Sequence, residues 1–134
     1  MSILSMPLAH IVATFEIEGE IYQVDHFQIG FRQPIDFKGK PQHEVTGGQL
    51  TVTLEQIVSP NLNEWMRNST ARKNGIILFR TQDTKIVYRV KFENAYCINF
   101  NQHMNDKGGL EVVLVIAPEI VYMNDMEHNN FWPK

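Results

Sequence analysis

Alternation of apolar and polar residues predicts two neighbouring strands near the start of the chain. Residues 13–17 alternate strictly, as a strand does when one face is buried and the other is solvated. A turn at 19–20 leads into a second strand over residues 21–32. The apolar phase of this strand shifts near Asp25 and His26, and one extra residue there would account for the shift. The pattern therefore predicts a β-bulge at this point.

Further β segments are predicted in the rest of the chain. Alternation is clean over residues 50–54, and residues 76–79 are apolar on both faces. Apolar residues at the even positions from 110 to 116 predict the last strong strand. From 86 to 100 the apolar residues keep the even positions over a length well beyond the usual strand of about 5–6 residues. The segment from 86 to 100 is either two strands bent at Asn94 or one long strand that wraps a barrel.

One short amphipathic helix is predicted after the third strand. Ser59 fits the N-cap with Pro60 at the first helical position, and Asn61 with Glu64 is an alternative cap pair. Residues 74–75, Asn-Gly, provide the stop. Spacing at i, i+3, i+4 and i+7 gives a narrow stripe: Leu62, Trp65, Met66 and Ser69. Because a single short helix cannot build a core alone, it must lie on a sheet.

About seven short strands and one helix predict a mostly β protein, an antiparallel barrel or sandwich with the helix docked on it. The length of 134 residues, with 43% hydrophobic and 20% charged residues, is that of one ordinary globular domain. We expect residues 1–8 and 124–134 to be terminal extensions of this domain.

The connection over residues 33–48 is the least ordinary segment of the chain. It holds two prolines, three glycines and four charged residues, and it follows neither a helical nor a strand period. Structureless connections beyond about 12–15 residues usually bind something or are disordered. Phe37 and Val45 argue against disorder, because solvated segments avoid such residues. The loop is therefore expected to pack against another surface.

Three large aromatic residues are further candidates for contacts. Trp65, at its helical spacing, is expected to be a core or interface anchor. Phe131 and Trp132 lie in a polar tail, so they need a partner surface on this subunit or on another.

Charge and cysteine content exclude several functional classes. The net charge is −3, and no block of basic residues is present, which disfavours nucleic-acid binding and a polybasic membrane contact. Cys97 is the only cysteine, so no internal disulfide can form, and its place in a strand pattern predicts a buried, inert thiol. The first 15 residues lack Lys or Arg and are interrupted by Pro7 and His10, so they predict neither a signal peptide nor a membrane span.

The sequence predicts no catalytic, cofactor or metal site. None of the five histidines is spaced from another ligand as in a zinc site, and no serine lies in a G-x-S-x-G motif. The glycine pairs at 47–48 and 108–109 do not precede a helix, so they are interpreted as turn glycines and not as phosphate loops. A binding or assembly module, not an enzyme, is the interpretation from the residues alone.

The order of these elements resembles the tube protein of bacterial type VI secretion systems, the haemolysin-coregulated protein (TssD) family, and most of all its branch in Bacteroidetes. The resemblance covers residues 9 to 132 and rests on an ordered combination of segments: Gln33-Pro34, Gly47-Gly48, Glu64-Trp65-Met66, Lys73-Asn74-Gly75, Phe92 to Cys97, Ile116 to Ile120, and Trp132.

The resemblance implies a β-barrel of two sheets with one flanking helix, assembled as a ring of six subunits. In the family, rings stack into a tube that a contractile sheath drives into a neighbouring cell together with effectors. Sheath, baseplate, spike and effector proteins are the implied partners. The protein would be made in the cytoplasm and secreted through the apparatus.

By the same resemblance, the long loop corresponds to one that reaches a neighbouring subunit or the next ring. The implied interface residues are Gln33, Pro34, Ile35, Asp36, Phe37, Gly39, Pro41, Val45, Gly47 and Gly48. Trp65, Phe131 and Trp132 are possible additions.

Three alternatives stay open at the level of sequence. A phage-like or extracellular contractile injection particle uses a tube subunit of the same architecture. A monomeric, lipocalin-like barrel would bind a small molecule, with the loop as its lid. A hydrolase would need residues that converge from distant strands.

Overall fold

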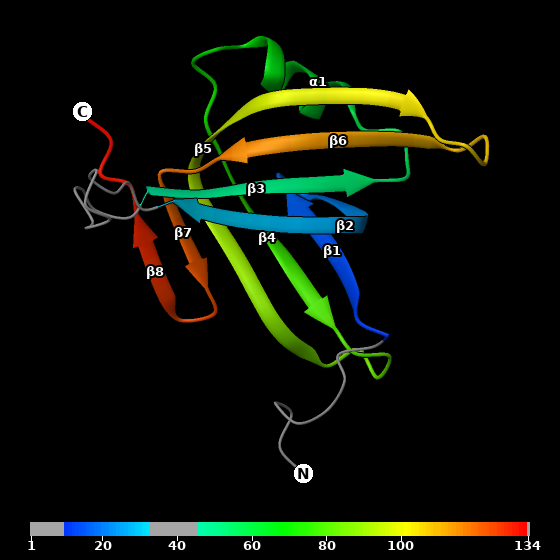
Figure 1. The fold of residues 1–134 in the computed structure, drawn as a ribbon, viewed down its shortest axis with the longest axis horizontal. Helices are drawn as coiled ribbons and strands as arrows, with labels where there is room; N and C mark the ends of the chain where they lie inside the picture. The colour runs from blue at the N-terminus through cyan, green and yellow to red at the C-terminus, as the bar shows by residue number, and fades with distance from the viewer. Residues whose placement is uncertain (1–9, 33–45, 134) are drawn as a thin grey trace, which may run out of the picture.

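The computed structural model describes residues 10–32 and 46–133, which form eight strands and one helix (Figure 1). The elements are β1 (Val12–Ile17), β2 (Glu20–Arg32), β3 (Thr46–Leu54), α1 (Pro60–Arg67), β4 (Lys73–Arg80), β5 (Ile86–Met104), β6 (Leu110–Ala117), β7 (Ile120–Met123) and β8 (Met126–Asn129).

Six of the strands are joined by hydrogen bonds into a closed ring. The order is β4-β1-β2-β3-β6-β5, and a further pairing of β4 with β5 closes it, with every ladder antiparallel. The hairpin of β7 and β8 continues the sheet from β5. The prediction of a mostly β, antiparallel fold with one short helix is confirmed. The strand β8 was not predicted, because its residues fall in the polar tail that was expected to be an extension.

Two long strands connect the two layers of this ring. The start of β2 pairs with β1 and its remainder with β3, and the register shifts between Val24 and His26. The predicted β-bulge is therefore confirmed. β5 is one strand of 19 residues that pairs first with β4 and then with β6, with Asn94 at φ 56° between the two parts. Bulges bend strands and change their direction. Each of the two long strands therefore turns from one layer to the other at its irregular position, and these two turns are the corners of the barrel.

We call the two layers by their strands. Layer one contains β1, β4, the start of β2 and residues 86–94 of β5, and layer two contains β3, β6, residues 26–32 of β2 and residues 96–104 of β5. In Figure 1, β3 and β6 of layer two run horizontally, whereas β1 and β4 of layer one run obliquely. The two sheets implied by the sequence are therefore two layers of one continuous hydrogen-bonded sheet.

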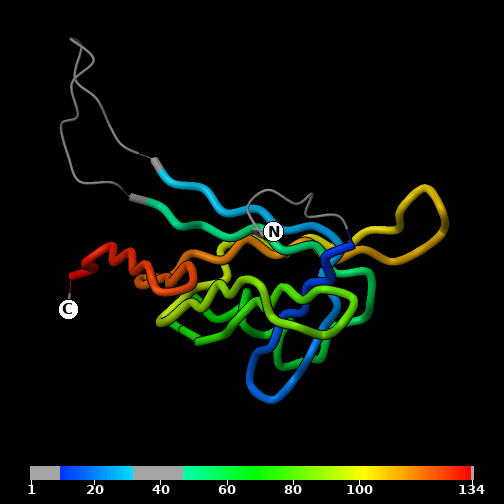
Figure 2. The backbone as a smooth tube through the Cα atoms, turned by 90° about the horizontal axis from the view of Figure 1, so that it is seen from below, coloured from blue at the N-terminus to red at the C-terminus, as the bar shows by residue number. Residues whose placement is uncertain are grey.

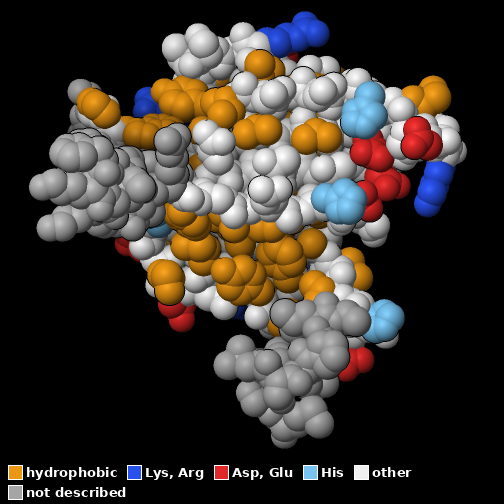
Figure 3. All heavy atoms as spheres, viewed as in Figure 1, with side chains coloured by type: hydrophobic (Ala, Val, Ile, Leu, Met, Phe, Trp, Pro, Cys, Tyr) orange, Lys and Arg blue, Asp and Glu red, His pale blue; other side chains and the backbone are white. Residues whose placement is uncertain are grey.

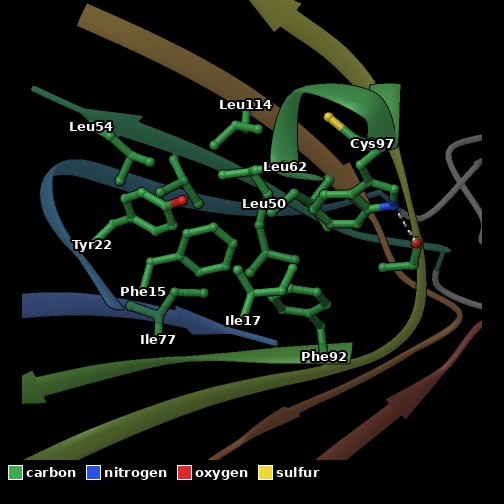
Figure 4. Close-up of a cluster of buried hydrophobic side chains, with 14 of the residues drawn as sticks. Phe15, Ile17, Tyr22, Leu50, Leu54, Leu62, Ile77, Phe92, Cys97 and Leu114 are labelled. Atoms are coloured by element: carbon green, nitrogen blue, oxygen red, sulfur yellow. Dashed lines mark hydrogen bonds between the residues drawn. The ribbon is translucent and has the colours of Figure 1, made fainter. Parts of the chain in front are cut away.

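The space between the layers is filled by apolar side chains (Figure 4). Phe15 from β1, Phe92 from β5 and Leu50 from β3 are fully buried. The aromatic rings of Phe15 and Phe92 lie 6.1 Å apart between centroids. Leu62 and Trp65 of α1 join the same cluster and are each 1% exposed, so they hold the helix on the sheet. The other two members of the predicted stripe do not: Met66 is 39% exposed, and Ser69 lies beyond the end of the helix.

The start of the helix was predicted correctly and its end was not. Ser59 is the N-cap, with its hydroxyl accepting from the Leu62 N–H at 3.2 Å, and Pro60 follows at the first turn. The helix ends at Arg67 and does not continue to the Asn-Gly pair at 74–75, which lies in β4. Asn68 ends the helix because its side-chain oxygen accepts from the N–H and the hydroxyl of Thr70, which stabilises an extended turn.

Candidate functional site

Two strand edges of layer two have no β-partner among the residues that the structure describes. Residues 26–32 of β2 pair with β3 on one side only, and residues 96–104 of β5 pair only with β6. Ile98 lies on the second edge, where the register between β5 and β6 shifts, and it is 47% exposed. An unpaired edge presents N–H and C=O groups that can pair with another chain. Layer two therefore ends on both sides in a surface suited to association.

The outward face of layer two is largely uncharged. Its strand register places two rows of side chains across four strands: Gln28, Thr51, Val115 and Asn99, then His26, Thr53, Val113 and Asn101. Residues between these positions, such as Val52 and Leu114, are buried in the core. The two rows contain no Asp, Glu, Lys or Arg, so this face is uncharged there, and Thr53 within it is only 7% exposed.

Acidic groups gather at one end of layer two, beside two histidines. The Asp25 carboxylate, first by its charge and second by a hydrogen bond, raises the pKa of Glu55, and Glu111 adds to the effect. His26 Nε2 lies 3.3 Å from an Asp25 oxygen, and His103 Nε2 lies 3.5 Å from Glu111. Figure 3 shows acidic and histidine side chains together at the end where β6 begins. This end of the molecule is therefore negative near neutral pH.

At the opposite end, β2 and β3 project from the body as an arm, which we define as residues 28–32 and 46–49 (Figure 2). Gly47 and Gly48 were predicted as the end of the long loop, but they lie in β3, where Gly47 pairs with Phe31. Gly48 has φ +73°, and a Cβ there would lie 2.8 Å from Val121 Cγ1. Only glycine suits this position, because β2, β3 and β7 approach one another closely there.

An open groove of about 700 Å³ lies beside the base of the arm. Gln28, Gly30 and Thr51 line one side, and Pro118 and Trp132 line another. The remaining residues of the predicted loop interface, from Gln33 to Val45, lie outside the described residues, so their role stays a prediction.

A family comparison identifies the chain. The model of the family "Hemolysin coregulated protein Hcp (TssD)" matches residues 9–133. The chain belongs to this family. The resemblance found in the sequence is confirmed, and the Hcp assignment covers all described residues from 10 onwards. Among curated protein sequences, none is similar enough to count as a match.

Solved structures agree with the Hcp assignment at the level of the fold. The chain is 24% identical to Hcp1 from Flavobacterium johnsoniae, with a TM-score of 0.79, and the match covers 89% of this chain and 99% of that one. Hcp1 from Salmonella typhimurium is 12% identical with a TM-score of 0.68, over 84% of each chain. A chain from the sheath/tube terminator of an extracellular contractile injection system, PVC, is 15% identical with a TM-score of 0.57, over 89% of this chain and 96% of that one.

The aromatic candidates have different surroundings in this Hcp fold. Trp65 was predicted to be a core anchor or an interface anchor, and it is a core anchor. Its side chain is 1% exposed, so it offers almost no surface to a partner. Trp132 finds its partner surface on this subunit, where it stacks on Tyr96 with ring centroids 5.3 Å apart. Phe131 projects outward and is 70% exposed. Of the three, Phe131 is the most exposed side chain, and its predicted role at an interface stays a prediction.

The thiol of Cys97 is buried. Burial raises the pKa of the Cys97 thiol to about 11, so the nucleophilic thiolate is scarce at neutral pH. The buried, inert thiol predicted from the strand pattern is confirmed. Within residues 10–32 and 46–133, no group of three or more His, Cys, Asp or Glu side chains is arranged to hold a metal ion. In the same ranges, no helix has the length and hydropathy that crossing a membrane requires.

The sequence missed Ile98 as a surface residue. It shares the even positions of the apolar side chains at 86–100 and was therefore expected on the buried face. The register shift between Cys97 and Asn99 inserts one residue, which leaves Ile98 at the free edge. A bulge of this kind leaves no sign in the apolar pattern when the extra residue is itself apolar.

Proposed function

We propose that this chain is a structural subunit of the inner tube of a type VI secretion system, with six copies forming a ring. The two free edges of layer two carry this proposal. They lie at opposite sides of one four-stranded layer, so residues 26–32 of one copy can meet residues 96–104 of the next. Such a head-to-tail contact joins different patches and closes into a ring when the rotation allows.

The neutral face of layer two would line the channel of this ring. Joining the edges makes the layers of six copies continuous, and the rows that contain Thr51 and Val115 then form one wall. Rings would stack into a tube that the sheath expels, so that the protein leaves the cell through the apparatus with effectors carried in or on the tube. Baseplate and spike proteins are the remaining partners, and no nucleic acid, membrane insertion or catalytic role is included.

The long loop, from Gln33 to the start of β3, is proposed as the contact to a neighbouring subunit or the next ring. It continues from the arm, which already projects from the body. Phe37→Asp should weaken assembly and leave the barrel folded by circular dichroism, because a carboxylate resists burial in a contact. Rings that persist unchanged in this variant would remove Phe37 from the contact.

A tube in an extracellular contractile injection particle is the second candidate, supported by the similarity to a chain of the PVC particle. It shares the ring and the channel and differs in its sheath and baseplate partners, so co-purification of those partners separates the two. A lipocalin-like binding role has less support, because Phe15, Trp65 and Phe92 fill the space that a ligand would need.

Electron micrographs of the purified protein test the ring directly, with particles of one diameter as the expected result. Ile98→Lys should disperse them, since it places a charge on the joining edge. Ile57→Lys is the matched control: Ile57 is 77% exposed and lies in the connection between β3 and α1, on neither edge strand. A strictly monomeric wild-type protein at high concentration would contradict the proposal, as would an equal effect of both substitutions.

A further inference from the structure

The side chain of Asn130 makes four hydrogen bonds, which is all that an amide can make. Its Nδ2 donates to the carbonyl of Gly47 at 2.8 Å and to that of Pro118 at 3.0 Å. Its Oδ1 accepts from the Gly47 N–H at 3.2 Å and lies 3.0 Å from Nε2 of His128. Because Oδ1 only accepts, the Nε2 of this histidine is the donor.

These bonds replace a stretch of β-ladder that the sequence prevents. β6 pairs with β3 up to Ile116, opposite Leu50. Two further steps would bring Pro118 opposite Gly48, but proline has no N–H to donate and cannot continue the ladder. The Asn130 amide instead bonds both backbone groups of Gly47 and joins them to the end of β6.

The same residue connects the arm to the tail. Gly47 pairs with Phe31 across the arm, so the bonds to Asn130 fix both arm strands. The Phe31 ring meets the His128 ring edge-on, with centroids 4.9 Å apart. On its other side, the Asn130 backbone N–H donates to the backbone carbonyl of Glu119 at 2.8 Å, which holds the tail on the barrel.

We propose that Asn130 is a positioning residue for assembly: it clamps the arm to the barrel at Gly47 and so sets the direction in which the arm reaches its neighbour. The effect on assembly rests on the proposed tube function, whereas the clamp itself rests on geometry alone. The clamp gives the C-terminal tail a role in assembly.

The test uses one isosteric substitution and a matched control. In Asn130→Asp a carboxylate replaces the amide and can no longer donate, so the oxygen in place of Nδ2 faces the carbonyls of Gly47 and Pro118 without a proton to share. Asn129→Asp makes the same charge change one residue earlier. There the side-chain oxygen only accepts, from the Phe131 N–H at 2.7 Å, and a carboxylate still can.

Two measurements are made on both variants of the full chain. Hydrogen exchange should accelerate about tenfold or more at amides of the arm in Asn130→Asp, since the arm loses two of the hydrogen bonds that hold it on the barrel. Exchange at β1 and β4 should change less than about twofold. The concentration at which half the protein is in rings, measured by native mass spectrometry, should rise about tenfold or more. Asn129→Asp should change neither.

Arm exchange that equals the wild type, or acceleration spread evenly over the barrel, overturns the clamp. An arm that loosens while rings form at the wild-type concentration overturns its role in assembly. If the wild type forms no rings at all, the proposed tube function fails, and the exchange measurement still decides whether Asn130 holds the arm.

Discussion

The indole N–H of Trp65 donates to the carbonyl of Ala95 at 3.2 Å, and the Trp65 ring lies parallel to Phe92 at a centroid distance of 6.3 Å. Ala95 directly follows Asn94, the positive-φ residue at which β5 passes from one layer to the other. The helix is therefore attached to the barrel at one of its corners. There the strand ladder is irregular, and the Trp65 side chain supplies a hydrogen bond to the backbone.

Trp65→Phe should lower the free energy of unfolding by about 1–3 kcal/mol, since it leaves the Ala95 carbonyl buried without its partner. Urea denaturation at a fixed protein concentration measures the loss. Met66→Leu on the same helix is the control, because Met66 is an exposed neighbour, and it should change stability by less than about 0.5 kcal/mol. Equal stability of Trp65→Phe and the wild type would show that the hydrogen bond contributes nothing.

Ser59→Ala should cost about 0.5–2 kcal/mol of the free energy of unfolding, the usual loss for an N-cap. The hydroxyl accepts from the Leu62 N–H and donates to Glu20 at 2.8 Å, so the substitution also separates the helix start from β2. Ser69→Ala, at an exposed position beyond the helix, is the reference variant. A loss no larger than that of the reference would mean that α1 forms independently of its cap.

Gly48→Ala and Gly108→Ala separate backbone strain from crowding. Both glycines have positive φ, +73° and +80°, so alanine is strained at each. A Cβ at Gly108 has no neighbour within 4 Å, whereas one at Gly48 would lie 2.8 Å from Val121. The loss of stability should therefore be larger at Gly48 by about 1–3 kcal/mol, the usual cost of overpacking. Thermal unfolding of both variants measures the difference, and equal losses would contradict the close approach of β3 and β7.

Cys97 should make stability fall between pH 9 and 11. Burial raises its pKa from 9.0 to about 11, so in this range the unfolded thiol loses its proton while the folded one keeps it. The unfolded state then binds fewer protons than the folded state, and the free energy of unfolding decreases as pH rises. Cys97→Ala lacks this contribution, so its urea midpoint should fall less than that of the wild type over the same range. Parallel declines in the two proteins would show that other groups cause the whole effect.

The sequence could predict those features whose signal is local. The alternation in β1 and the phase shift near Asp25 follow from the two-residue period of a strand. The Ser59-Pro60 pair favours a helix start, because the fixed φ of proline suits the first helical position. Membership of the Hcp family also followed from the order of segments.

Features that depend on tertiary pairing could not be predicted in this way. β8 has polar residues on an edge, and only its ladder with β7 makes it a strand. A signal was available at Asn124-Asp125, a two-residue turn with Asn124 at φ 55°, because such pairs are typical of tight hairpins. No comparable signal marks Asn130, since its four partners converge only in the folded chain.

The closed ring of strands also bears on how the chain folds. β1 pairs with β2, and β7 with β8, across short turns, but two ladders join distant segments: Val12 with Arg80, and Leu50 with Ile116. Forming such contacts costs loop entropy before their hydrogen bonds compensate for it. The local hairpins are therefore expected to form first and the β1–β4 and β3–β6 ladders last. Until those ladders close, the edges of β1, β3, β4 and β6 are also free to pair. Premature pairing between chains is therefore the reaction that competes with folding.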